Sequence, residues 1–305
     1  MRKLSWTHIG ARLCALALAL ICATAATAEE KPRVVTVNQA LHDLAERLSD
    51  GAADIVFPVP QGVDPSFWRP AIADISMIQS ADLILLNGAG FATWIDRVSL
   101  PRSRIVNTSA AITDRFIVTQ SITHSHGDGG EHSHEGVASY TWLDPTLAIA
   151  QAEAIAAAFI ARDLAPAEAV EAQLAALRAD LTALDTTARD ALNGLAGTSI
   201  IATHPRYQYF AARYGLTISS LEWEAGAMPT DAQFAELKRL SEEQNAQILI
   251  WEAQPPAEAL AAVERLGLQS VIFEPGAVQG SLGTFIEAYA QAVSDLSDAA
   301  RLTSN

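Results

Sequence analysis

Four histidines lie close together in one stretch of the chain, separated by glycines and carboxylates: His124, His126, His132 and His134. Neutral imidazole is a common nitrogen ligand for zinc, and glycine lets a loop fold around an ion. His-rich tracts indicate metal binding by their composition. A polar surface loop with a weak, adventitious metal site would have the same composition. We predict that residues 121–137 form a metal-binding loop without regular structure.

Residues 1–28 have the features of a secretory signal: basic residues, an apolar run over 13–23 and small residues before Glu29. The run is shorter than the roughly 20 residues that span a bilayer. Both cysteines, Cys14 and Cys22, fall inside this segment, and neither is in a lipid-attachment context. We therefore expect a free, soluble periplasmic protein that holds its metal through nitrogen and oxygen.

The charge balance argues against nucleic acid as a partner. The chain has 20 Lys and Arg against 35 Asp and Glu, a net charge of −15. Such a protein attracts cations and repels polyanions. The sequence also has no nucleophile elbow, no His-Glu-x-x-His helix and no phosphate-binding glycine loop. We expect a binding protein that catalyses no reaction, with an enzyme as a distant alternative.

Runs rich in β-branched residues alternate with helical spacing in both halves of the chain. In the first half we expect strands at 33–37, 54–59, 83–86 and 104–107, and helices at 41–48, 72–80 and 91–98. In the second half we expect strands at 199–203, 216–220, 247–251 and 270–273, and helices at 207–214, 231–243, 257–266 and 283–302. The fold class is therefore α/β, with parallel sheets in two lobes.

Two helices are expected between the lobes. The first starts at Asp144 and Pro145 and ends near Ala161, and the second starts near Pro166 and ends at Gly194 or Gly197. A helix from 166 to 193 would be roughly 42 Å long, enough to cross both lobes as a stiff spine. Its leucine stripe fits core packing better than a coiled-coil surface. The predicted divisions are residues 29–143, 144–197 and 198–305.

Ligands of open parallel sheets bind at the carboxyl ends of the strands, so the residues that follow each predicted strand are candidate site residues. They include Ser66, Arg69, His204, Arg206, Glu222, Glu224 and Glu274. A buried histidine and a solvated acidic rim would have the same pattern. The two arginines could contact a metal chelate or another small ligand, or they could form ion pairs with carboxylates. A guanidinium group cannot bind a bare cation, because both are positively charged.

Four segments of the chain resemble the periplasmic metal-binding proteins of zinc and manganese ABC importers, of the zinc-uptake type with a His-rich loop. They are the segment that starts GVDPSFWRP, and SYTWLDP, ATHPRYQYFAARYGL and IFEPGAV. The likeness runs over essentially the whole chain after residue 28. It implies the two-lobed cluster A-I solute-binding fold with a spine helix, a monomer, and delivery of the metal to a membrane permease.

The resemblance also implies a metal held by one ligand from each of the four segments, histidines and carboxylates together. In this sequence the first two histidine positions are Ser66 and Tyr140, so His204 and Glu274 remain as the expected metal ligands. One imidazole and one carboxylate are too few for zinc, which takes three or four protein ligands.

Three arrangements would complete the site. The His-rich loop would donate histidines into the cleft, with Glu222 or Glu224 assisting. Alternatively, the cleft would hold a metal chelate or another small ligand through Ser66, Tyr140 and the arginines. In the third arrangement, a Tyr140 phenolate with His204 and carboxylates would favour manganese or iron. We expect capture of a divalent metal, zinc ahead of manganese and iron; a periplasmic metal buffer or chaperone acting through the loop is the alternative function.

Overall fold

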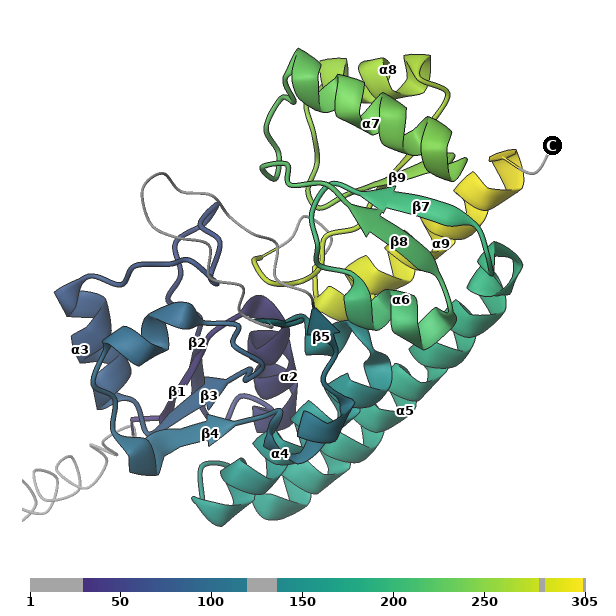
Figure 1. Cartoon of the computed structure of the whole chain (residues 1–305). Helices are drawn as coiled ribbons and strands as arrows, with labels where there is room; N and C mark the ends of the chain where they lie inside the picture. The colour runs from purple at the N-terminus through teal and green to yellow at the C-terminus, as the bar shows by residue number, and fades with distance from the viewer. Residues whose placement is uncertain (1–29, 120–135, 280–282, 304–305) are drawn as a thin grey trace, which may run out of the picture. The chain divides into compact units, whose positions relative to one another are not determined.

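The computed structural model describes residues 30–119, 136–279 and 283–303. Contacts divide the chain into two units, residues 1–31 and 32–305, and nearly all described residues belong to the second. The expected signal segment and the four loop histidines lie outside the described residues, so the interpretations placed on them remain predictions. The described helices and strands are labelled in Figure 1.

A parallel four-stranded sheet forms in the first half of the chain. Its strands, in the order β2-β1-β3-β4, are β1 (Arg33–Thr36), β2 (Asp54–Val56), β3 (Leu83–Leu86) and β4 (Ile105–Asn107). The helices that connect them are α2 (Gln39–Ser49) and α3 (Ile72–Ser80). Helix α2 begins where the Asn38 side chain accepts a hydrogen bond from the backbone N–H of Leu41 at 2.8 Å. The β-branched and leucine side chains of β1 and β3 are almost fully buried, which is why these runs form inner strands.

The second half repeats this topology. Its strands, in the order β10-β9-β7-β8, are β7 (Ser199–Ala202), β8 (Thr217–Ser220), β9 (Ile248–Trp251) and β10 (Gln269–Ile272), all parallel. The helices are α6 (Gln208–Tyr214), α7 (Asp231–Gln244), α8 (Ala257–Arg265) and α9 (Phe285–Thr303). In each sheet the first strand lies between the second and the third. The predicted α/β class with parallel sheets is confirmed.

Two helices join the sheets, α4 (Pro145–Ala161) and α5 (Ala167–Leu192). Helix α5 has 26 residues, which corresponds to a length of about 39 Å. It packs against α2 and α4 on the N-terminal side and against α6 and α9 on the C-terminal side (Figure 1). Its stripe residues Leu177, Leu181 and Leu184 are buried, so the stripe belongs to the core. Within the described ranges, no helix has both the length and the apolar character needed to cross a bilayer.

Two segments differ from the sequence prediction. The helix predicted over 91–98 is a short 3-10 helix, η1 (Thr93–Arg97), because Gly88, Ala89 and Gly90 have positive φ angles and delay its start. The predicted loop has regular structure at its base, where β5 (Val118–Thr119) pairs antiparallel with β6 (Gly136–Val137). The remaining 3-10 helices are η2 (Arg102–Arg104), η3 (Ala110–Arg115), η4 (Thr141–Leu143) and η5 (Asn193–Leu195).

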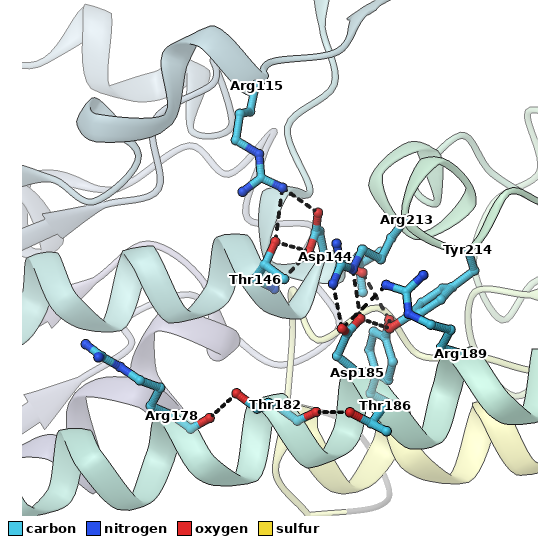
Figure 2. A network of polar contacts seen from close by, with 12 residues as sticks. Arg115, Asp144, Thr146, Arg178, Thr182, Asp185, Thr186, Arg189, Arg213 and Tyr214 are labelled. Carbon is cyan, nitrogen blue, oxygen red and sulfur yellow. Dashed lines mark hydrogen bonds and ion pairs between the residues drawn. The ribbon is translucent and has the colours of Figure 1, made fainter.

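A polar network ties α6 to the two connecting helices (Figure 2). Asp185 of α5 accepts hydrogen bonds from Arg213 Nε at 2.8 Å and from the Tyr214 hydroxyl at 3.2 Å, both on α6. Arg213 also lies 3.7 Å from Asp144, which caps the start of α4. The hydrogen bond from Arg213 lowers the pKa of Asp185, and partial burial opposes that effect. The network therefore holds the C-terminal end of α6 against α5 and the start of α4.

We expect Asp185→Asn to lower the free energy of unfolding by about 2 kcal/mol at neutral pH, because it removes a charged acceptor shared by Arg213 and Tyr214. Since the folded-state pKa is lowered, the contribution of Asp185 is present above its ordinary value of 3.8 and lost as pH falls below it. Urea unfolding at pH 7 and pH 3 measures both effects. Glu153→Gln is the control, because Glu153 pairs with Arg178 on an exposed surface and its loss costs under about 0.5 kcal/mol. Equal losses for the two variants would contradict the assignment.

Candidate functional site

A cleft of about 590 Å³ lies where the strand ends of the C-terminal sheet meet the loop after β2. This volume is typical of a site for a small ligand. The charged and aromatic residues that line it come from both halves of the chain: Asp64, Phe67, Tyr140, His204, Arg206, Glu222, Trp223, Glu224, Glu252 and Glu274. Carboxylates outnumber cationic side chains in this lining, so the cleft favours positive ligands.

His204 follows β7 and has a defined orientation. Its Nδ1 lies 2.9 Å from the carbonyl oxygen of Trp223, and the Trp223 N–H donates to the carbonyl of Thr203 at 2.9 Å. A carbonyl can only accept, so Nδ1 carries a hydrogen, and in the neutral ring the lone pair is on Nε2. Nε2 lies 3.8 Å from Glu222 Oε2. The fold therefore places Nε2 beside a carboxylate, with Nδ1 fixed by the backbone.

Arg206 bridges the two sides of the cleft. Its Nε donates to Glu252 Oε1 at 3.1 Å, and its NH2 group donates to Asp64 Oδ2 at 2.7 Å. Asp64 is held in turn by the backbone N–H of Ser66, which donates to Oδ1 at 2.8 Å. The second oxygen of Glu252 lies 3.3 Å from His204 Nδ1. One guanidinium thus connects the loop after β2 to the carboxylate beside the candidate ligand.

Tyr140 forms the wall beneath this bridge. The Arg206 guanidinium lies 4.8 Å from the centre of the Tyr140 ring, within cation–π range. Asn87 at the end of β3 donates to the carbonyl of Ser139 at 2.8 Å, and Trp142 Nε1 donates to the carbonyl of Pro275 at 2.6 Å, so the backbone on both sides is fixed. Burial raises the pKa of Tyr140, and Arg206 lowers it by less, so the phenol stays protonated in the metal-free cleft.

The two positions where the resemblance predicts histidine hold buried hydroxyls. The Ser66 and Tyr140 oxygens make no hydrogen bond of full geometry among the described residues, although the Ser66 side chain is near enough to lower the pKa of Tyr140. Glu252 Oε2 also makes no such hydrogen bond, and its nearest named contact is His204 Nδ1 at 3.3 Å. Buried polar atoms without partners are rare in folded proteins and are typical of places where a ligand or water binds. Within the described ranges, no three His, Cys, Asp or Glu side chains converge to hold a metal.

The remaining candidates fall into two groups. Glu222, Glu224 and Glu274 line the same cleft as His204, and Glu222 Oε2 lies 3.8 Å from His204 Nε2. Arg69 lies elsewhere, in a separate hollow that also contains Trp68. The four loop histidines are outside the described residues.

Asp64 and Glu252 are two residues of this site that the sequence analysis did not single out. Both carboxylates contact Arg206, at separations along the chain of 142 and 46 residues. The available signal was their position, since Asp64 stands in the loop after β2 and Glu252 directly follows β9. Nothing local indicated that an arginine after β7 would pair with both.

We expect Tyr140→Phe to lower the free energy of unfolding by less than about 1 kcal/mol, because its hydroxyl has only the nearby Ser66 side chain as a partner and that contact falls short of full hydrogen-bond geometry. The matched control is Tyr207→Phe. The Tyr207 hydroxyl is also buried but donates to the carbonyl of Phe273 at 2.6 Å, so its removal should cost about 1–3 kcal/mol. Thermal or urea unfolding of both variants measures the difference. A cost for Tyr140→Phe as large as that of the control would show that its hydroxyl is satisfied.

Comparison with known proteins gives a consistent set of relatives. The chain is 28% identical over 246 residues to the zinc-binding lipoprotein AdcA of Streptococcus pneumoniae serotype 4, covering 78% of this chain and 48% of AdcA. It is 26% identical over 204 residues to the manganese ABC transporter substrate-binding lipoprotein PsaA of Streptococcus pneumoniae, covering 65% and 64%. The chain thus spans about half of AdcA and under two thirds of PsaA.

The fold matches a solved structure over nearly its whole length. The crystal structure of the Zn(II)-bound ZnuA-like domain of Streptococcus pneumoniae AdcA superimposes with a TM-score of 0.73 at 17% identity, covering 88% of this chain and 99% of that domain. The family model for the zinc-uptake complex component A, periplasmic, matches residues 34–299. Because this match takes in both sheets and the helices between them, the protein belongs to the periplasmic zinc-uptake complex component A family.

Proposed function

We propose that this protein is a periplasmic solute-binding protein that captures a divalent metal ion, zinc ahead of manganese or iron, and passes it to the membrane permease of an ABC importer. Membership of the zinc-uptake family supports the class of function. Zinc is named for AdcA and manganese for PsaA, which supports this choice of metals. The proposal includes no catalysed step and needs one copy of the chain.

The observation that carries the proposal is the arrangement of His204. Its Nδ1 is held by the Trp223 carbonyl at 2.9 Å, which leaves Nε2 beside Glu222 in an acidic cleft. A fixed imidazole with one free nitrogen is how proteins present histidine to zinc. Glu224 and Glu274 line the same cleft and are the further candidate oxygen ligands.

We propose that the loop histidines gather metal and deliver it to the cleft, and that they add a nitrogen ligand to those the cleft already has. The base of the loop is anchored to α6, because the backbone N–H of Ile117 donates to the hydroxyl of Tyr209 at 3.2 Å. Helix α6 directly follows the segment that contains His204 and Arg206. Sixteen residues, 120–135, separate the two strands of this base. This length supports donation of an imidazole into the cleft or delivery of metal to it.

One observation favours an alternative. Because the described residues offer no cluster of three ligating side chains, the protein could instead be a periplasmic metal buffer whose loop is the functional site. The unpartnered hydroxyls of Ser66 and Tyr140 would equally suit a metal chelate in the cleft. Shortening the loop separates cleft binding from loop binding.

The sharpest test replaces residues 120–135 by Asn-Gly. Thr119 and Gly136 are paired across β5 and β6, so a two-residue turn closes the hairpin without strain. We expect the shortened protein to bind one zinc ion in calorimetry, through His204 and the cleft carboxylates. In this background, His204→Ala should weaken zinc binding at least tenfold, because it removes the fixed imidazole.

His42→Ala in the same background is the matched control. His42 lies on α2, where it contacts Gln39 and Asp43, and it does not line the cleft. We expect its zinc affinity to equal that of the shortened parent. An unchanged affinity in His204→Ala would contradict cleft binding, and complete loss of zinc on shortening the loop would favour the buffer.

A further inference from the structure

A protein cation already occupies the bridging position between the two halves of the cleft. The Arg206 guanidinium lies 2.7 Å from Asp64 and 3.1 Å from Glu252, carboxylates that belong to different halves of the chain. Among the described residues that line the cleft, Arg206 is the only arginine or lysine. Its single positive charge is shared between the two carboxylates.

The bridge is held rigidly. The side chain of Arg206 is 10% exposed and that of Glu252 is 12% exposed, and the guanidinium lies over the Tyr140 ring at 4.8 Å. The Glu252 backbone N–H donates to Thr203 Oγ1 at 3.1 Å, and Asp64 is fixed by the Ser66 N–H. A charge this enclosed does not leave its partners without a large cost.

The bridge changes which oxygen atoms a metal can use. Without the guanidinium, Asp64 and Glu252 would offer up to four carboxylate oxygens from opposite sides of one cleft. Oxygen-rich sites favour hard cations such as manganese, whereas imidazole favours zinc. With Arg206 present, one oxygen of each carboxylate is engaged, and the Nε2 side of His204 is where a metal can bind.

We propose that Arg206 is a specificity-determining residue of this cleft, which excludes hard divalent cations by holding Asp64 and Glu252 and so restricts the site to metals that bind the His204 imidazole. The inference rests on the proposed function, because it concerns the choice of metal at the same cleft. The proposal predicts that replacing Arg206 strengthens manganese binding. A purely structural ion pair predicts no such gain.

Arg206→Gln tests the proposal in the loop-shortened protein. Glutamine removes the charge but keeps an amide donor for Glu252, which protects the fold, and thermal unfolding checks that it does. We expect manganese binding, measured by calorimetry, to tighten at least tenfold, because Asp64 and Glu252 become free to bind. The affinity for zinc should change less than the affinity for manganese. The ratio of zinc affinity to manganese affinity should therefore fall.

Three further variants define the result. Arg206→Lys keeps a cation between the carboxylates, and Arg69→Met removes an arginine from a different hollow; neither should gain manganese affinity. Arg206→Gln combined with Glu252→Gln should lose the gain, because one carboxylate of the new site is gone. Unchanged manganese affinity in Arg206→Gln, or a gain that survives in the double variant, would overturn the proposal.

Failure of this inference is distinguishable from failure of the proposed function. If His204→Ala leaves zinc affinity unchanged, the cleft is not the zinc site, whatever Arg206 does. If zinc binding requires His204 but Arg206→Gln gains no manganese affinity, the importer function stands and Arg206 is only a structural tie.

Discussion

One guanidinium fixes the geometry on which the rest of the cleft depends. Arg206 joins Asp64, in the loop after the second strand, to Glu252, at the end of β9, and lies over the ring of Tyr140. The Arg206 and Glu252 side chains are almost fully removed from water. Breaking the ion pair between them leaves a buried charge unpaired, which costs about 3–5 kcal/mol. The bridge therefore sets the distance between the two walls of the cleft. His204 then has its position on one wall, independent of any ligand.

This constraint explains how a member of a zinc-uptake family can have hydroxyls at two positions where the resemblance predicts imidazoles. Ser66 and Tyr140 are buried beside the bridge, and the Arg206 guanidinium lies over the Tyr140 ring. Burial keeps the pKa of Tyr140 above its ordinary value, so its hydroxyl serves as a neutral wall. In the function proposed here, metal would bind on the Nε2 side of His204, among acidic side chains. Metal capture would then depend on one fixed imidazole instead of a complete preformed set of ligands.

The fold could be predicted from the sequence to within a few residues, because its elements are determined locally. The inner strands are runs of buried aliphatic residues, and Pro145 and Pro166 mark the starts of the long helices. The prediction failed near residue 91, where consecutive positive φ angles are needed by the turn and are not visible in a hydrophobic pattern. The site was predictable only in part. His204 could be found because strand ends of parallel sheets meet at one edge, whereas the pairing of Arg206 depends on tertiary contacts over more than a hundred residues.

The most direct test of this account is anomalous diffraction at the zinc edge from crystals of the loop-shortened protein grown with one equivalent of zinc. The account predicts a single strong peak about 2.0–2.1 Å from His204 Nε2, with Arg206 still bound to Asp64 and Glu252. A peak between Asp64 and Glu252 with Arg206 displaced, or no peak near His204, would contradict it.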